Sequence, residues 1–130
     1  MSDALFDTTV FIDWWRGEAG AMELVEAVKS GELTASYSTM TIAELWQWDQ
    51  LDRQEEIEYT ALTRHYFEEA PLGFEAARLA GTWLRDCSRN QRRELFADAL
   101  IAATAQLRQE TVYSRDEGHL RRFYPQVQPY

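Results

Sequence analysis

The sequence predicts a three-layer α/β/α domain, in which helices cover both faces of a central parallel sheet of four to five strands. Short segments at residues 4–6, 33–38 and 111–114 have the apolar, β-branched or aromatic composition of strands. Segments with helical spacing of apolar residues lie between them. Strands that alternate with helices favour a parallel sheet. The length of 130 residues fits one domain, which we expect to span residues 1–130.

The first half of the chain is expected to begin with a buried strand that runs through a turn into a helix. Gly17 and Gly20 interrupt this region, and Gly31 occupies the position of a helix C-cap. Ser38, Thr39 or Thr41 is available to cap the helix that follows the second strand. The expected elements are a strand at 4–6, a helix at 21–30, a strand at 33–38, and helices at 41–53 and 54–67.

The second half of the chain predicts two longer helices and one more buried strand. Small residues such as Ala99, Ala102 and Ala103 suit close packing of the second helix on a sheet. The expected elements are an extended piece at 70–72, a helix at 74–88, a polar loop at 88–93, a helix at 96–109, a strand at 111–114, and an edge strand or frayed end at 125–130.

The composition restricts the class of protein. The net charge is −9, from 22 acidic and 13 basic residues, which by itself argues against a nucleic-acid binder and mildly favours a basic partner protein or a metal site. Cys87 is the only cysteine, so no internal disulfide can form, as in proteins of a reducing cytosol. The sequence contains no apolar run long enough for a membrane span and no signal peptide, so we expect a cytoplasmic protein without membrane contacts.

Four acidic residues are placed where a parallel sheet usually binds ligands. Asp7 and Asp116 follow predicted strands, and ligands bind outside the carboxyl ends of such strands. Glu44 and Asp98 fall in the first turns of predicted helices, where the partial positive charge favours an ionised carboxylate. We therefore expect the four acids to converge at one end of the sheet.

Clustered carboxylates repel one another unless a cation lies among them. Oxygen ligands without His or Cys suit Mg²⁺, with Mn²⁺ also possible, whereas His65 and His119 are too few and too scattered for zinc. The alternative is that Glu44 and Asp98 are ordinary first-turn acids and that Asp116 only forms a turn.

Four segments place these acids within recognisable motifs. They are LFDTTVFID at 5–13, TMTIAEL at 39–45, FADALIAATA at 96–105 and VYSRD at 112–116. Together they resemble the PIN-domain ribonucleases, in particular the VapC-like toxins of type II toxin–antitoxin systems. The segment at 96–105 is the most specific match, and the other three gain weight from their order along the chain.

The resemblance implies a PIN-like fold and a Mg²⁺-dependent endoribonuclease that acts as a toxin. It assigns the catalytic and metal-binding roles to Asp7, Glu44, Asp98 and Asp116, of which Asp116 occupies the most variable position. It places the hydroxyl of Thr8 near the metal and the substrate. It also implies RNA as substrate, a cognate antitoxin protein as partner, and a homodimer.

Two charged segments have both a functional and an ordinary interpretation. Arg89, Arg92 and Arg93 precede the Asp98 helix and are candidate contacts to the RNA backbone, or else a solvated loop. The acidic helices around residues 49–58 are a candidate docking face for a basic partner, or else a solvated surface. Five tryptophans fit core packing or a dimer interface better than catalysis.

Two competing functions remain at the level of sequence. One is a nuclease of RNA or DNA processing outside any toxin–antitoxin system, against which the short chain argues. The other is a catalytically inactive PIN-like module that only binds a protein, against which the presence of all four acids argues.

Overall fold

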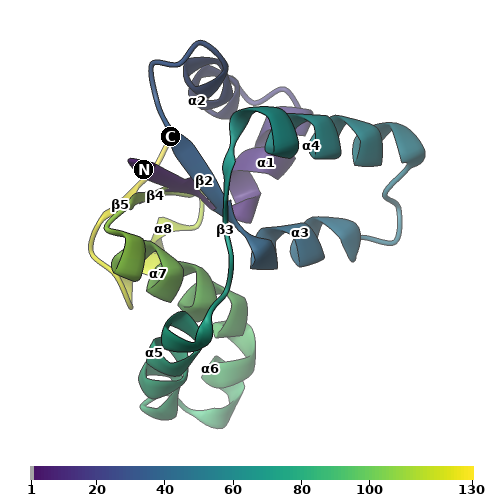
Figure 1. The fold of residues 1–130 in the computed structure, drawn as a ribbon. Helices are drawn as coiled ribbons and strands as arrows, with labels where there is room; N and C mark the ends of the chain where they lie inside the picture. The colour runs from purple at the N-terminus through teal and green to yellow at the C-terminus, as the bar shows by residue number, and fades with distance from the viewer. Residues whose placement is uncertain (1) are drawn as a thin grey trace.

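The computed structural model of the chain describes residues 2–130, which form five strands and eight helices (Figure 1). No helix in this part of the chain is long and apolar enough to cross a membrane. The strands are β1 (Ala4–Phe6), β2 (Ala35–Ser38), β3 (Glu68–Ala70), β4 (Thr111–Tyr113) and β5 (Val127–Gln128). The helices are α1 (Thr8–Trp15), α2 (Ala19–Lys29), α3 (Thr39–Trp46), α4 (Arg53–Tyr66), α5 (Phe74–Arg85), α6 (Arg89–Glu94), α7 (Phe96–Arg108) and α8 (Glu117–Arg121).

The strands form one parallel sheet in the order β3-β2-β1-β4-β5. The chain moves outward from β1 through β2 to β3, and then returns to the other side of β1 to form β4 and β5. The strand order therefore reverses between β1 and β4. Loops that leave two such strands in opposite directions open a crevice at their carboxyl ends, which is the usual ligand site of this architecture.

Helices cover both faces of the sheet, as the sequence predicts for an α/β/α fold (Figure 1). Phe6 points into the core shared with α1, α2, α3 and α4, whereas its neighbour Leu5 points into the core shared with α7 and α8. This alternation follows from the two-residue period of a strand. A third cluster packs α5 against α7, with Ala80, Ala99 and Ala103 at 0% exposure. The small side chains allow the two helices to approach closely.

Most predicted elements are confirmed, and the differences have local causes. The helix expected at 41–53 ends at Trp46, and a separate helix, α4, begins at Arg53. Its N-cap residue is Asp52, whose side chain forms a capping box with Glu55. The loop expected at 88–93 is wrong, because Ser88 and Gln91 form a second capping box that begins α6. The sequence analysis also missed α8. The expected edge strand is present as β5.

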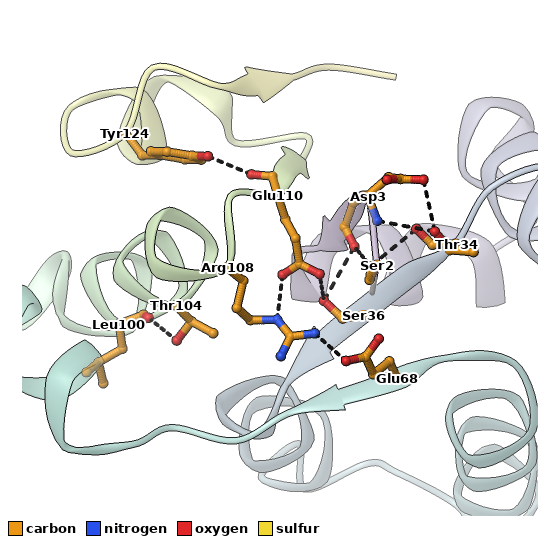
Figure 2. Close-up of polar contacts among 11 residues, drawn as sticks. Ser2, Asp3, Thr34, Ser36, Glu68, Leu100, Thr104, Arg108, Glu110 and Tyr124 are labelled. Carbon is orange, nitrogen blue, oxygen red and sulfur yellow. Dashed lines mark hydrogen bonds and ion pairs between the residues drawn. The ribbon is translucent and has the colours of Figure 1, made fainter.

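A buried polar network fastens the end of the sheet opposite the crevice (Figure 2). Glu110 is fully buried just before β4 and accepts hydrogen bonds from Ser36 Oγ at 2.7 Å and Arg108 Nε at 2.8 Å. Arg108 also donates to Glu68 on β3 at 2.7 Å, and Tyr124 donates to the carbonyl of Glu110 at 2.8 Å. The network connects β2, β3 and the segments that precede β4 and β5. Glu110 is thus a structural acid, separate from the four candidates.

Replacing Glu110 with Ala is expected to lower the free energy of unfolding by about 2 kcal/mol, because Ser36 would lose its shorter hydrogen bond and Arg108 its buried carboxylate partner. Urea denaturation followed by circular dichroism measures this change. The matched control is Glu23→Ala, which removes an exposed acid of α2 and should change stability by less than about 0.5 kcal/mol. Equal stability of the two variants would contradict the structural role of Glu110.

Candidate active site

Asp7 lies at the carboxyl end of β1, at the reversal point of the sheet. Its side chain is only 4% exposed, and its Oδ2 atom accepts hydrogen bonds from Ser114 Oγ at 2.7 Å and Thr9 Oγ1 at 2.9 Å. Burial raises the pKa of the Asp7 carboxyl, and the two hydroxyl donors oppose that rise. The structure thus holds this carboxylate in one orientation within a dry environment.

The same two hydroxyls fix the loop that follows β4. Ser114 Oγ accepts the backbone N–H of Asp116 at 2.9 Å, and Thr9 Oγ1 accepts the backbone N–H of Arg115 at 3.1 Å. Each hydroxyl therefore accepts from the loop and donates to Asp7. Asp116 is brought to the crevice in this way, and its side chain is exposed to solvent.

Glu44 lies in the second turn of α3 and not in the first turn as predicted, because the helix already starts at Thr39, directly after β2. Its side chain reaches back to α1. Thr8 Oγ1 donates to Glu44 Oε1 at 2.6 Å and lies 2.9 Å from the hydroxyl of Thr41. Burial raises the pKa of the Glu44 carboxyl, and the charge of Asp7 adds to the rise, while the Thr8 hydrogen bond opposes it. Thr8 is therefore near the candidate metal ligands, as the resemblance implies.

Asp98 lies in the first turn of α7, with 21% of its side chain exposed. Burial and then the negative charge of Asp7 raise the pKa of Asp98 to about 6, with smaller contributions from Glu44 and Asp116. His119 of α8 opposes the shift, and its Nδ1 atom lies 3.5 Å from Asp98 Oδ2. Asp7, Glu44 and Asp116 all act on the pKa of Asp98, so these three acids lie within electrostatic reach of Asp98.

The acids are grouped but do not form a closed ligand set. Among residues 2–130, no three His, Cys, Asp or Glu side chains lie at the mutual distances of a preassembled metal site. The chemistry of the donors nevertheless fits a hard cation. All four are carboxylates, and the negative charge of neighbouring acids raises the pKa of two of them, Glu44 and Asp98. A divalent cation among them would offset this repulsion.

Three residues of the site were given no role by the sequence analysis. Thr9 and Ser114 follow β1 and β4, and a hydroxyl near the end of each of two neighbouring strands was the available signal. His119 was considered only as a zinc ligand. His119 follows Asp116 by three residues, so the two would lie on the same side of a helix. This signal could not be used because α8 was not predicted.

The arginines before Asp98 are exposed on α6 rather than in a loop. Arg92 is already engaged, since its guanidinium donates to the carbonyls of Cys87 at 3.1 Å and Arg85 at 3.4 Å. It thereby caps the end of α5. Within residues 2–130, Arg89 and Arg93 make no ion pair, and α6 leads directly into the helix that carries Asp98.

An all-parallel sheet with acidic side chains near its strand-order reversal is typical of α/β domains that bind a ligand at the carboxyl ends of their strands. The sequence profile of the PIN domain matches residues 4–124. The chain belongs to the PIN-domain family, whose members are generally nucleases, and the resemblance noted from the four sequence segments is confirmed. Comparison with curated proteins gave no significant match.

Several solved structures share the fold over nearly the whole chain. A toxin–antitoxin complex from Klebsiella pneumoniae has 25% sequence identity and a TM-score of 0.70, and the match covers 96% of this chain and 95% of that one. VapBC2 from Rickettsia felis, bound to a promoter DNA fragment, has 14% identity, a TM-score of 0.72 and 98% coverage of both chains. FitAcB from Neisseria gonorrhoeae has 19% identity, a TM-score of 0.63, and coverage of 98% and 96%.

Because the pKa of Asp98 is raised, we expect the free energy of unfolding of the metal-free protein to depend on pH. A carboxyl whose pKa is higher in the folded protein binds more protons there than in the unfolded chain, so stability falls as the pH rises from about 4 to about 6. Asp98→Asn removes this loss, and its free energy of unfolding at pH 7 should exceed that of the unaltered protein by on the order of 1–3 kcal/mol.

Chemical denaturation in EDTA at pH 4 and pH 7 measures the effect. The advantage of the Asn variant should shrink at pH 4, where Asp98 is protonated in the folded protein. An Asn variant that is no more stable than the unaltered protein at pH 7 would show that Asp98 is not under electrostatic strain.

Proposed function

We propose that this protein is a Mg²⁺-dependent endoribonuclease and the toxin of a toxin–antitoxin pair. The observation that carries the proposal is the set of four carboxylates at the strand-order reversal of a PIN fold. Asp7, Glu44, Asp98 and Asp116 are the proposed catalytic and metal-binding residues. The Klebsiella relative supports the biological setting, since it is described as part of a toxin–antitoxin complex.

Asp7, Glu44, Asp98 and Asp116 would hold Mg²⁺, or Mn²⁺ in its place. A divalent cation bound there would lower the pKa of a coordinated water and neutralise charge on the scissile phosphate. The chain's own contribution is orientation. Ser114 and Thr9 direct the carboxyl group of Asp7, and Thr8 directs that of Glu44, so both groups are oriented before substrate arrives.

The RNA backbone favours contact with positive charge, and the chain as a whole is acidic, with 22 acidic and 13 basic residues. Arg89 and Arg93 are the proposed phosphate contacts, because they are exposed on the helix that leads to Asp98. Arg92 stands apart from them, since its hydrogen bonds to Cys87 and Arg85 already give it a structural role. Only the N–H groups of Arg92 that do not take part in these two hydrogen bonds are left to contact a phosphate.

Substitution of Asp98 by Asn should reduce RNA cleavage by at least about 100-fold, because a ligand and its charge are lost. Unaltered protein should cut RNA with Mg²⁺ or Mn²⁺ and lose activity in EDTA, and metal should raise its melting temperature. Asp7→Asn should show a smaller metal-induced shift. The matched control is Asp86→Asn, an exposed acid at the end of α5.

The two competing functions give different results in the same assay. Cleavage of DNA in preference to RNA would indicate a processing nuclease. A metal-induced thermal shift without cleavage of either polymer would indicate a binding module. Cleavage by Asp98→Asn at the unaltered rate would exclude this crevice as the active site.

The proposed antitoxin needs a docking surface, and a pocket of about 780 Å³ beside Glu44 supplies one. It lies between α1, α3 and α4, with the exposed aromatic side chains of Trp15 and Trp48 in its wall. Glu55 also lines it. This residue is 5% exposed, and its Oε2 atom is the one buried side-chain polar atom of residues 2–130 without a hydrogen-bond partner. An acidic, aromatic pocket suits a basic partner segment with apolar side chains.

Glu55→Gln should weaken binding of the cognate antitoxin by about tenfold, because a buried carboxylate loses its charge for a basic group. Gln keeps the third position of the α4 capping box, so the helix should be unaffected. Isothermal titration with the antitoxin encoded next to the toxin measures the change. Glu23→Gln on the exposed face of α2 is the control, and equal affinities for both variants would exclude this pocket.

We also propose a homodimer. Phe74, Phe96 and Leu107 of α5 and α7 are large apolar side chains that are 78%, 53% and 51% exposed. A second copy of the chain packed on α5 and α7 would remove these side chains from water. None of the three lines the pocket proposed for the antitoxin.

A further inference from the structure

Asp13 is a buried acid of α1 that none of the proposed steps uses. It is 4% exposed, and both of its carboxylate oxygens are occupied. Arg115 Nη1 donates to Oδ1 at 2.5 Å, and Tyr130 Oη donates to Oδ2 at 2.5 Å. A buried carboxylate is stable only when paired in this way. Arg115 follows Asp13 by 102 positions in the sequence, and Tyr130 follows it by 117.

Arg115 stands between Ser114 and Asp116, in the loop that closes the candidate site. Its backbone is tied to Thr9, and 48% of its side chain remains exposed. A guanidinium forms short, charge-assisted hydrogen bonds with any carboxylate it can reach. Asp116 is its neighbour in sequence and is itself exposed. Without another acceptor, the Arg115 guanidinium would be free to pair with the carboxylate of the adjacent Asp116.

Tyr130 holds Asp13, the other acceptor of the Arg115 guanidinium, in place through a hydrogen bond. It follows β5, which pairs with β4, and it packs against α2 at Gly20. A Cβ atom at Gly20 would lie 2.9 Å from the backbone carbonyl carbon of Tyr130, so the helix can approach this residue only because it carries glycine there. Burial, together with the hydrogen bond to Asp13, raises the pKa of the Tyr130 phenol. The hydroxyl therefore remains a donor at neutral pH.

We propose that Asp13 and Tyr130 are positioning residues that hold the guanidinium of Arg115 away from Asp116 and so keep the Asp116 carboxylate free for the cation. This inference rests on the proposed function, because it gives Asp116 a cation to bind. Asp13 acts by removing a competitor from the site rather than by touching substrate.

Mn²⁺ affinity, measured by isothermal titration on the intact protein without RNA, tests the proposal. Asp13→Asn should weaken Mn²⁺ binding by about fivefold or more, and Tyr130→Phe should weaken it less, by about twofold to threefold. Arg115→Gln alone should bind Mn²⁺ as the unaltered protein does. The double variant Asp13→Asn/Arg115→Gln should also bind normally, because the competing guanidinium is gone.

The rescue separates this role from a merely structural one. If Asp13 only supports the fold, the double variant will bind Mn²⁺ as weakly as Asp13→Asn or more weakly, and the proposal is overturned. In an Asp116→Asn background, Asp13→Asn should have no further effect. Normal Mn²⁺ binding by Asp13→Asn would overturn the positioning role alone, whereas no Mn²⁺ binding by the unaltered protein would overturn it together with the metal dependence of the proposed nuclease.

Discussion

The carboxylate of Asp7 is buried where the sheet reverses its strand order, and the hydroxyls of Thr9 and Ser114 both donate to its Oδ2 atom. These hydroxyls also accept the backbone N–H groups of the loop after β4. The same two hydroxyl groups therefore provide hydrogen bonds to a buried carboxyl group and hold a surface loop in place. Removal of one hydroxyl would leave a buried oxygen short of a donor and a loop N–H short of an acceptor. The remainder of the crevice is arranged around these hydrogen bonds.

The crevice places negative charges together at a cost in stability, and the fold limits that cost in three ways. Hydroxyl donors stabilise Asp7 and Glu44, the nearby His119 partly offsets the charge around Asp98, and Asp116 is left in water. A buried acid that does not serve the crevice, Glu110, is instead fully paired at the other end of the sheet. The acids of the candidate site therefore keep some unbalanced negative charge, whereas the structural acid Glu110 does not. Such a difference is common at functional sites.

Local patterns were sufficient for most of the fold and for the place of each acid along the chain. Asp7 could be located because an apolar strand precedes it, and Asp98 because the helix pattern starts just before it. The short α6 was wrongly predicted as a loop because its six residues are all polar, although the Ser88–Gln91 capping pattern was visible. The burial of Glu110 and the partners of Asp13 could not be predicted, since they depend on contacts 74 and more than 100 residues apart in sequence.

Three of the four acids differ in exposure in an order that fits their proposed use. Asp7 is buried at the floor beside the sheet, Asp98 is partly covered on α7, and Asp116 faces solvent at the rim. A hydrated cation entering from solvent would meet Asp116 first and the rigidly held Asp7 last. Hydrogen bonds orient Asp7 before any ligand arrives. The charge around Asp116, in contrast, depends on where the guanidinium of Arg115 is held. Control of Arg115 is therefore a means of tuning this crevice without altering the acids at its floor.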